Sequence, residues 1–111
     1  MGLELDTALK ERICIVLANP QRPVTEAQLR KLSEEGRAYS LILAAELGRL
    51  ERRLAELDTD PRSPLGAIAP AYRRVHDFRA HLAELNRLLS ALDDRARQVR
   101  TSWLLRSPGG R

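Results

Sequence analysis

The sequence predicts an all-α protein built around one long antiparallel, coiled-coil-like helical hairpin. Two runs of apolar positions at heptad spacing, a proline-rich break between them and a core composition almost free of aromatic residues predict this fold. Apolar residues make up 43% of the chain and charged residues 31%, whereas aromatic residues make up only 4%. A core of Leu, Ala, Ile and Val suits packed helices better than a β-sandwich. We expect one helical domain over residues 1–106 and a flexible tail over 107–111.

The heptad pattern is clearest in the second half of the chain. Apolar positions there alternate between spacings of four and three, as one buried seam on a helix requires. They are Ala71, Val75, Phe78, Leu82, Leu85, Leu89, Leu92, Ala96, Val99 and Trp103, all of which we expect in the core. A weaker seam with the same alternation precedes it, consisting of Leu29, Ser33, Gly36, Ser40, Leu43, Leu47, Leu50, Leu54 and Leu57.

The first predicted helix is shorter and covers residues 3–18. Its apolar stripe consists of Leu5, Leu9, Ile13 and Val16, with Lys10 and Glu11 on the opposite, solvated side. The segment 13–17 is rich in β-branched residues, so a short buried strand is the alternative there. Asn19-Pro20 ends the segment, because a residue before proline is disfavoured in the helical conformation.

The second predicted helix covers residues 25–57. Thr25 and Gln28 have the spacing of a capping box, in which each side chain bonds to the other residue's backbone N–H. Pro61 and Pro64 end the helix firmly.

The third predicted helix covers residues 70–105. Pro70 would remove a backbone donor from a helix that was already running, so we expect a short turn over 64–69 before the helix begins. Ser107-Pro108-Gly109-Gly110 ends it.

Charged residues beside the two seams predict the register of the hairpin. In an antiparallel pair that turns near residues 64–66, equivalent edge positions face each other. This brings Glu51 near Arg79 and Arg37 near Asp93, and both pairs are attractive. Exposed ion pairs contribute only about 0–1 kcal/mol, so they select the register more than they stabilise the fold.

The apolar stripe is wider than a two-stranded seam needs. We expect the first helix to cover part of it, giving a three-helix arrangement, and a second copy of the chain to cover the rest, giving a homodimeric larger bundle. The residues that either close the core or carry a partner are Ile13, Ile15, Leu17, Leu32, Tyr39, Leu43, Leu47 and Leu88. A run of small residues between Gly36 and Gly48 either accommodates bulky neighbours or contacts another copy.

No motif points to catalysis, to a metal or to a cofactor. Asp77, His81 and Glu84 share a helix face, but this arrangement is also common on solvated helices. Cys14 lies in an apolar run, far in sequence from either His, so it fits a buried thiol better than a nucleophile. We therefore expect no enzyme, no metal site and no cofactor.

The basic residues gather in the last helix. Residues 1–70 carry ten Lys or Arg against eleven Asp or Glu, whereas residues 71–111 carry nine Arg against four acidic residues. Contact with the backbone of duplex nucleic acid is therefore the alternative function. The candidate anion contacts are Arg95, Arg97, Arg100 and Arg106.

The sequence thus indicates a helical interaction or oligomerisation module, similar in role to an adaptor or chaperone, whose partner is a second copy or another helical protein. Seventeen of its nineteen basic residues are Arg, which is typical of a GC-rich bacterial gene. Neither a membrane span nor a secretory signal is visible in the sequence, so we expect a cytoplasmic protein.

Overall fold

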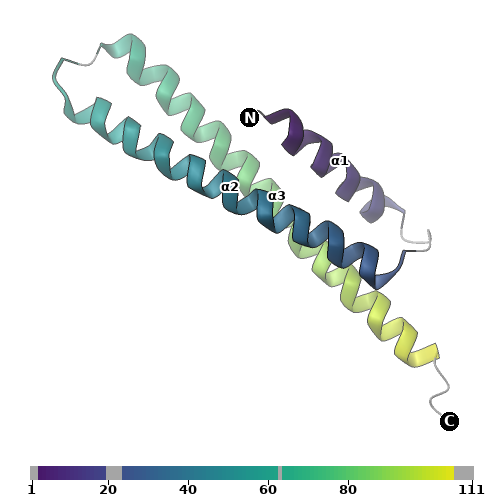
Figure 1. The fold of residues 1–111 in the computed structure, drawn as a ribbon. Helices are drawn as coiled ribbons and strands as arrows, with labels where there is room; N and C mark the ends of the chain where they lie inside the picture. The colour runs from purple at the N-terminus through teal and green to yellow at the C-terminus, as the bar shows by residue number, and fades with distance from the viewer. Residues whose placement is uncertain (1–2, 20–23, 63, 107–111) are drawn as a thin grey trace.

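The computed structural model describes residues 3–19, 24–62 and 64–106, and over these residues it contains three α-helices and no strand (Figure 1). Helix α1 spans Leu3–Ala18, α2 spans Glu26–Thr59 and α3 spans Leu65–Arg106. The last two form an antiparallel hairpin, and the molecule is a rod with extents of 74 × 20 × 17 Å. The predicted all-α hairpin with a shorter N-terminal helix is confirmed. The alternative of a strand over 13–17 is wrong.

Helix α1 accompanies only one half of the hairpin. It runs along the half that holds the beginning of α2 and the end of α3, and its N-terminus lies near the middle of the rod (Figure 1). The other half, next to the turn, is a two-helix structure. Its seam residues Leu47, Leu50, Leu54 and Leu57 are accordingly only half-buried.

Helix α2 begins as the sequence predicts. Thr25 is the N-cap: its Oγ1 accepts a hydrogen bond of 3.0 Å from the Gln28 N–H, and its own N–H donates 2.9 Å to Gln28 Oε1. The capping box satisfies backbone donors that the first turn leaves unpaired. The helix ends at Thr59, two residues later than predicted.

Helix α3 begins five residues earlier than predicted, so the turn expected over 64–69 is wrong. Pro70 lies inside the helix, at its sixth residue. There its missing N–H removes only the bond to the Gly66 carbonyl, and because both residues are exposed, water can solvate that carbonyl. The first turn is closed by the Ala67 N–H, which donates 2.9 Å to the Pro64 carbonyl. The predicted tail over 107–111 lies outside the described residues.

We expect the Pro70→Ala variant to be more stable than the wild type by about 1 kcal/mol. The substitution restores one helical hydrogen bond, and the gain is smaller than the ~3 kcal/mol of a mid-helix proline because the site is exposed and lies in the second turn. Urea unfolding followed by circular dichroism measures it. A decrease in stability would show that Pro70 positions the turn.

The core lies where the three helices meet. Leu85, Leu92 and Ile13 are fully buried there, and the seam is therefore confirmed at its centre. The buried apolar cluster consists of Leu9, Ile13, Leu29, Leu32, Tyr39, Leu43, Leu85, Leu89 and Leu92. Leu89 lies directly over Gly36, where an added Cβ would come within 2.3 Å of Leu89 Cδ2. Gly36 therefore accommodates a bulky neighbour within the hairpin.

The prediction that Trp103 belongs to the core is wrong, because its side chain is 63% exposed. Arg100 Nη2 donates 2.7 Å to Glu26 Oε2, and Glu26 is the first residue of α2. Trp103 lies about one turn farther along α3, where α2 no longer runs beside it. The heptad pattern of α3 therefore continues in the sequence beyond the point where α2 packs against it.

Candidate interaction surfaces

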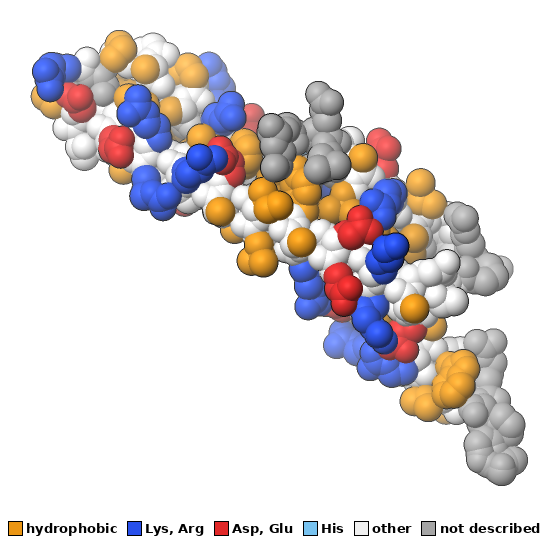
Figure 2. Space-filling view, in the orientation of Figure 1, with side chains coloured by type: hydrophobic (Ala, Val, Ile, Leu, Met, Phe, Trp, Pro, Cys, Tyr) orange, Lys and Arg blue, Asp and Glu red, His pale blue; other side chains and the backbone are white. Residues whose placement is uncertain are grey.

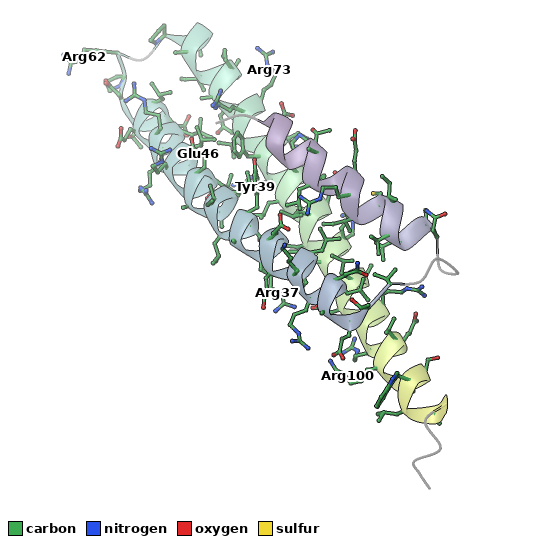
Figure 3. All side chains as sticks on the ribbon, turned by 45° about the vertical axis from the view of Figure 1, so that its right-hand side comes forward. Arg37, Tyr39, Glu46, Arg62, Arg73 and Arg100 are labelled. Atoms are coloured by element: carbon green, nitrogen blue, oxygen red, sulfur yellow. The ribbon has the colours of Figure 1, made fainter. Side chains whose placement is uncertain are left out.

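Most of the predicted partner-contact residues close the core within the chain. Ile13, Leu32, Tyr39 and Leu43 are buried. Leu17, Leu47 and Leu88 are half-buried, and Ile15 is exposed. Helix α1 therefore covers the apolar stripe of its own hairpin. Figure 3 shows Tyr39 among the helices, whereas Arg37 and Arg100 lie along an outer edge of the hairpin.

Helix α1 is held by ion pairs to both long helices. Lys10 is buried, contrary to the prediction that it faces solvent, and its Nζ donates to the Glu84 carboxylate and lies 3.0 Å from His81 Nδ1. The Arg12 guanidinium donates two hydrogen bonds, of 2.9 and 3.2 Å, to Glu35. Lys10 thus fixes α1 to α3, and Arg12 fixes it to α2.

The residues with metal-like spacing do not form a ligand cluster. His81 and Glu84 both contact the Lys10 ammonium, which supplies the positive charge between them. Within the part of the chain that the structure describes, no group of three or more His, Cys, Asp or Glu side chains is placed to hold a metal ion.

Three carboxyl groups that accept hydrogen bonds from a Lys or Arg side chain have lowered pKa values. Hydrogen bonds from Lys10 lower the pKa of Glu84, and hydrogen bonds from Arg12 lower the pKa of Glu35. At the end of the rod, hydrogen bonds from Arg100 lower the pKa of Glu26. In each case the cation favours the ionised carboxylate.

We expect the free energy of unfolding to fall as the pH drops below about 4.5, the ordinary value for these groups. A carboxyl whose pKa is lower in the folded state stabilises the fold above its unfolded pKa, and this contribution disappears as pH falls through the folded pKa. Glu84→Gln should therefore lose less stability than the wild type between pH 7 and pH 3 in urea titrations. Glu11→Gln, at an exposed position of α1, is the matched control. Equal losses in Glu84→Gln and the wild type would contradict the role of the Lys10–Glu84 pair.

Both ion pairs predicted across the hairpin are present. Arg79 donates to Glu51 Oε2 from Nη2 at 2.6 Å and from Nε at 3.1 Å, and Arg37 donates to the Asp93 carboxylate. The predicted antiparallel register is thereby confirmed.

The arginines predicted to contact anions are largely engaged within the chain. Arg97 pairs with Asp94, and Arg100 pairs with Glu26. Arg95 is half-buried, and the side chain of Arg106 is outside the described part of the chain. Acidic residues of α2 and α3 therefore counter the positive charge at this end of the rod.

The middle of α2 carries an exposed apolar surface that the sequence analysis missed. Leu41 is 73% exposed and Ile42 is 46% exposed, although the adjacent Leu43 is only 3% exposed. Ala38 and Ala45 are exposed on the same side of the helix, one turn before and after Leu41. We call these four residues the outer face of α2. Figure 2 shows apolar side chains gathered over the middle of the rod and again at the end of α3.

A second exposed apolar cluster lies at the end of α3. It consists of Trp103, Leu104 and Leu105, of which Leu105 is 81% exposed. Consecutive residues are 100° apart around a helix, so these three side chains point in different directions and do not form one face.

The chain shows no significant match to a known protein family, to a characterised protein or to a solved structure. Across the described residues, no helix combines the length and the apolar content that crossing a bilayer requires.

Proposed function

We propose that the chain is a non-enzymatic helical module for protein–protein interaction or oligomerisation, with an adaptor-like or chaperone-like role, and that it binds through the outer face of α2. The observation that carries this proposal is the 73% exposure of Leu41 at the centre of a four-residue apolar surface. Single exposed leucines are ordinary on protein surfaces, whereas contiguous apolar surfaces are typical of binding sites.

This surface is not needed for folding, because α1 already covers the core side of the hairpin. The outer face lies on the opposite side of α2 from the buried Gly36 and Leu43. A partner helix can therefore pack onto it without disturbing the core. Since α2 is held along its length by α3, binding orders little additional backbone, and a rigid surface loses less entropy on association.

The outer face suits a helical partner better than the end of α3 does. Ala38, Leu41 and Ala45 recur at helical spacing and form one stripe, into whose grooves the ridges of another helix fit. The three apolar residues at the end of α3 cannot all face one partner.

Photo-cross-linking in the cells that produce the chain tests the proposed function. A photoreactive benzoylphenylalanine at position 41 should give a discrete adduct, and adding Ala45→Glu to the same chain should abolish it. The same probe at Arg87, an exposed residue of α3, is the control. Absence of an adduct from position 41, or the same adduct from position 87, would contradict the proposal.

A further inference from the structure

We infer that the partner of the outer face is a second copy of the chain, docked through α2 in the antiparallel direction. This inference rests on the proposed function and names its partner. Ala38, Leu41 and Ala45 of the outer face belong to a longer stripe whose spacings alternate between four and three, like those of the buried seam on the opposite side. This outer stripe consists of Glu34, Ala38, Leu41, Ala45, Gly48 and Arg52.

The outer stripe is complementary to itself when reversed. A two-fold axis that passes the outer side of α2 at the level of residue 43 places Leu41 opposite Ala45 of the second copy. It also places Ala38 opposite Gly48 of the second copy. The same axis places Glu34 opposite Arg52 of the second copy, and each of these contacts occurs twice. The axis falls close to the middle of α2, which spans Glu26–Thr59, so the two helices overlap along almost their whole length.

The residues along the outer stripe allow the helices to approach closely. Leu41 of each copy faces the small Ala45 of the other copy. In the next layers outward, Ala38 of each copy faces Gly48 of the other. Among the residues that the structure describes, Arg52 Nη1, at 3.6 Å, is the one atom within 4 Å of a Cβ added at Gly48, so this position leaves room for a neighbouring helix. Small residues bring two backbones together and enlarge the contact between them.

Charge complementarity selects the antiparallel direction. Glu34 and Arg52 are exposed at the two ends of the stripe, and no ion pair joins either of them to another described residue. In the antiparallel dimer they pair with each other twice. A parallel dimer would instead place Glu34 against Glu34 and Arg52 against Arg52.

Helix α1 leaves this surface accessible. Its contact with α2 involves Glu35, which binds Arg12, and a groove that also includes Gln28 and Leu32. These residues lie on a different side of α2 from Glu34, Leu41 and Arg52, because a helix turns by 100° per residue. The second copy and α1 can therefore occupy α2 together.

Sedimentation equilibrium of the purified full chain, at low ionic strength, tests this inference. We expect the wild type to reach twice the monomer mass of 12.5 kDa with increasing concentration. Glu34→Arg alone and Arg52→Glu alone each create two like-charge contacts in the dimer. Each should raise the dissociation constant by at least about 10-fold, which corresponds to ~1.4 kcal/mol.

The decisive comparison is the equimolar mixture of these two variants. In the mixed dimer every position 34 again faces an opposite charge at position 52, so association should return to the wild-type strength. The double variant Glu34→Arg/Arg52→Glu should recover as well. Both substitutions are at exposed positions, and unchanged circular dichroism melts at monomeric concentrations show that folding is retained.

Three results would overturn the inference: a wild type that stays monomeric at several hundred micromolar, a dimer indifferent to both charge reversals, or a mixture no tighter than the single variants. A monomeric wild type whose position 41 cross-links to a different protein would overturn the second copy as partner and leave the proposed function standing. Loss of every adduct from position 41 would instead remove the proposed function.

Discussion

The Leu85→Asp variant should not form the folded domain at 25 °C. Leu85 is fully buried where the three helices meet. Truncating a buried leucine to alanine alone costs about 2–5 kcal/mol, and an aspartate there also loses the hydration of its carboxylate. The combined cost reaches the whole stability of a typical small domain, about 5–15 kcal/mol. Circular dichroism should show loss of the cooperative thermal transition.

The matched control is Leu65→Asp, the same substitution at a position that is 83% exposed. Leu65 is the first residue of α3, where a negative charge interacts favourably with the helix dipole. Its melting temperature should equal or slightly exceed that of the wild type. A Leu85→Asp variant that melts like this control would show that the core has been assigned to the wrong face of α3.

Gly36→Ala should destabilise the protein by about 1–3 kcal/mol, although alanine favours helices by about 1 kcal/mol over glycine. The added Cβ would lie 2.3 Å from Leu89 Cδ2, and Leu89 is itself packed in the core at 6% exposure. One of the two side chains must therefore move, and the dense core around Leu89 resists this movement. Urea unfolding measures the change in the free energy of unfolding.

Gly48→Ala in the same helix is the control for helix propensity. Its added Cβ meets only the Arg52 guanidinium, at an ordinary contact distance, so the monomer should become more stable by up to about 1 kcal/mol. The clash at Gly36 should also be relieved in the double variant Gly36→Ala/Leu89→Ala. In the Leu89→Ala background, Gly36→Ala should lower the free energy of unfolding by less than it does when Leu89 is present. Equal effects at the two glycines would contradict the close packing of Leu89 on Gly36.

Features that depend on neighbouring residues, or on the heptad pattern alone, could be predicted from the sequence. The capping box of α2 needs only Thr25 and Gln28 three residues later. The Glu51–Arg79 pair follows from the heptad positions once the turn is placed, because two regular helices keep a constant register along their length. Helical spacing thus determined both the fold and its register.

The remaining features depend on where the helices end and on which neighbours they meet. A proline in the second turn of a helix costs one hydrogen bond to the backbone, and the sequence does not reveal that the Gly66 carbonyl, which loses this bond, is exposed to solvent. The exposure of Trp103 follows from the unequal lengths of α2 and α3. Lys10 is buried because Glu84, 74 residues away, provides an acceptor for its ammonium.

The outer face of α2 escaped notice for a different reason. Leu41 and Ile42 immediately precede Leu43 in sequence, and the buried seam that includes Leu43 explains the apolar character of the segment. Only the exposure of these two side chains in the folded chain shows that apolar residues line opposite sides of one helix.

Small-angle X-ray scattering of the monomer, isolated by size-exclusion chromatography at low concentration, tests the central claim of a long antiparallel hairpin most directly. The structure predicts a radius of gyration close to 19.5 Å and a maximum dimension close to 74 Å. A compact globular protein with the same number of residues would have a radius of gyration of about 13 Å. A chain with α2 and α3 end to end would exceed about 110 Å in length. Either of these two results would contradict the hairpin.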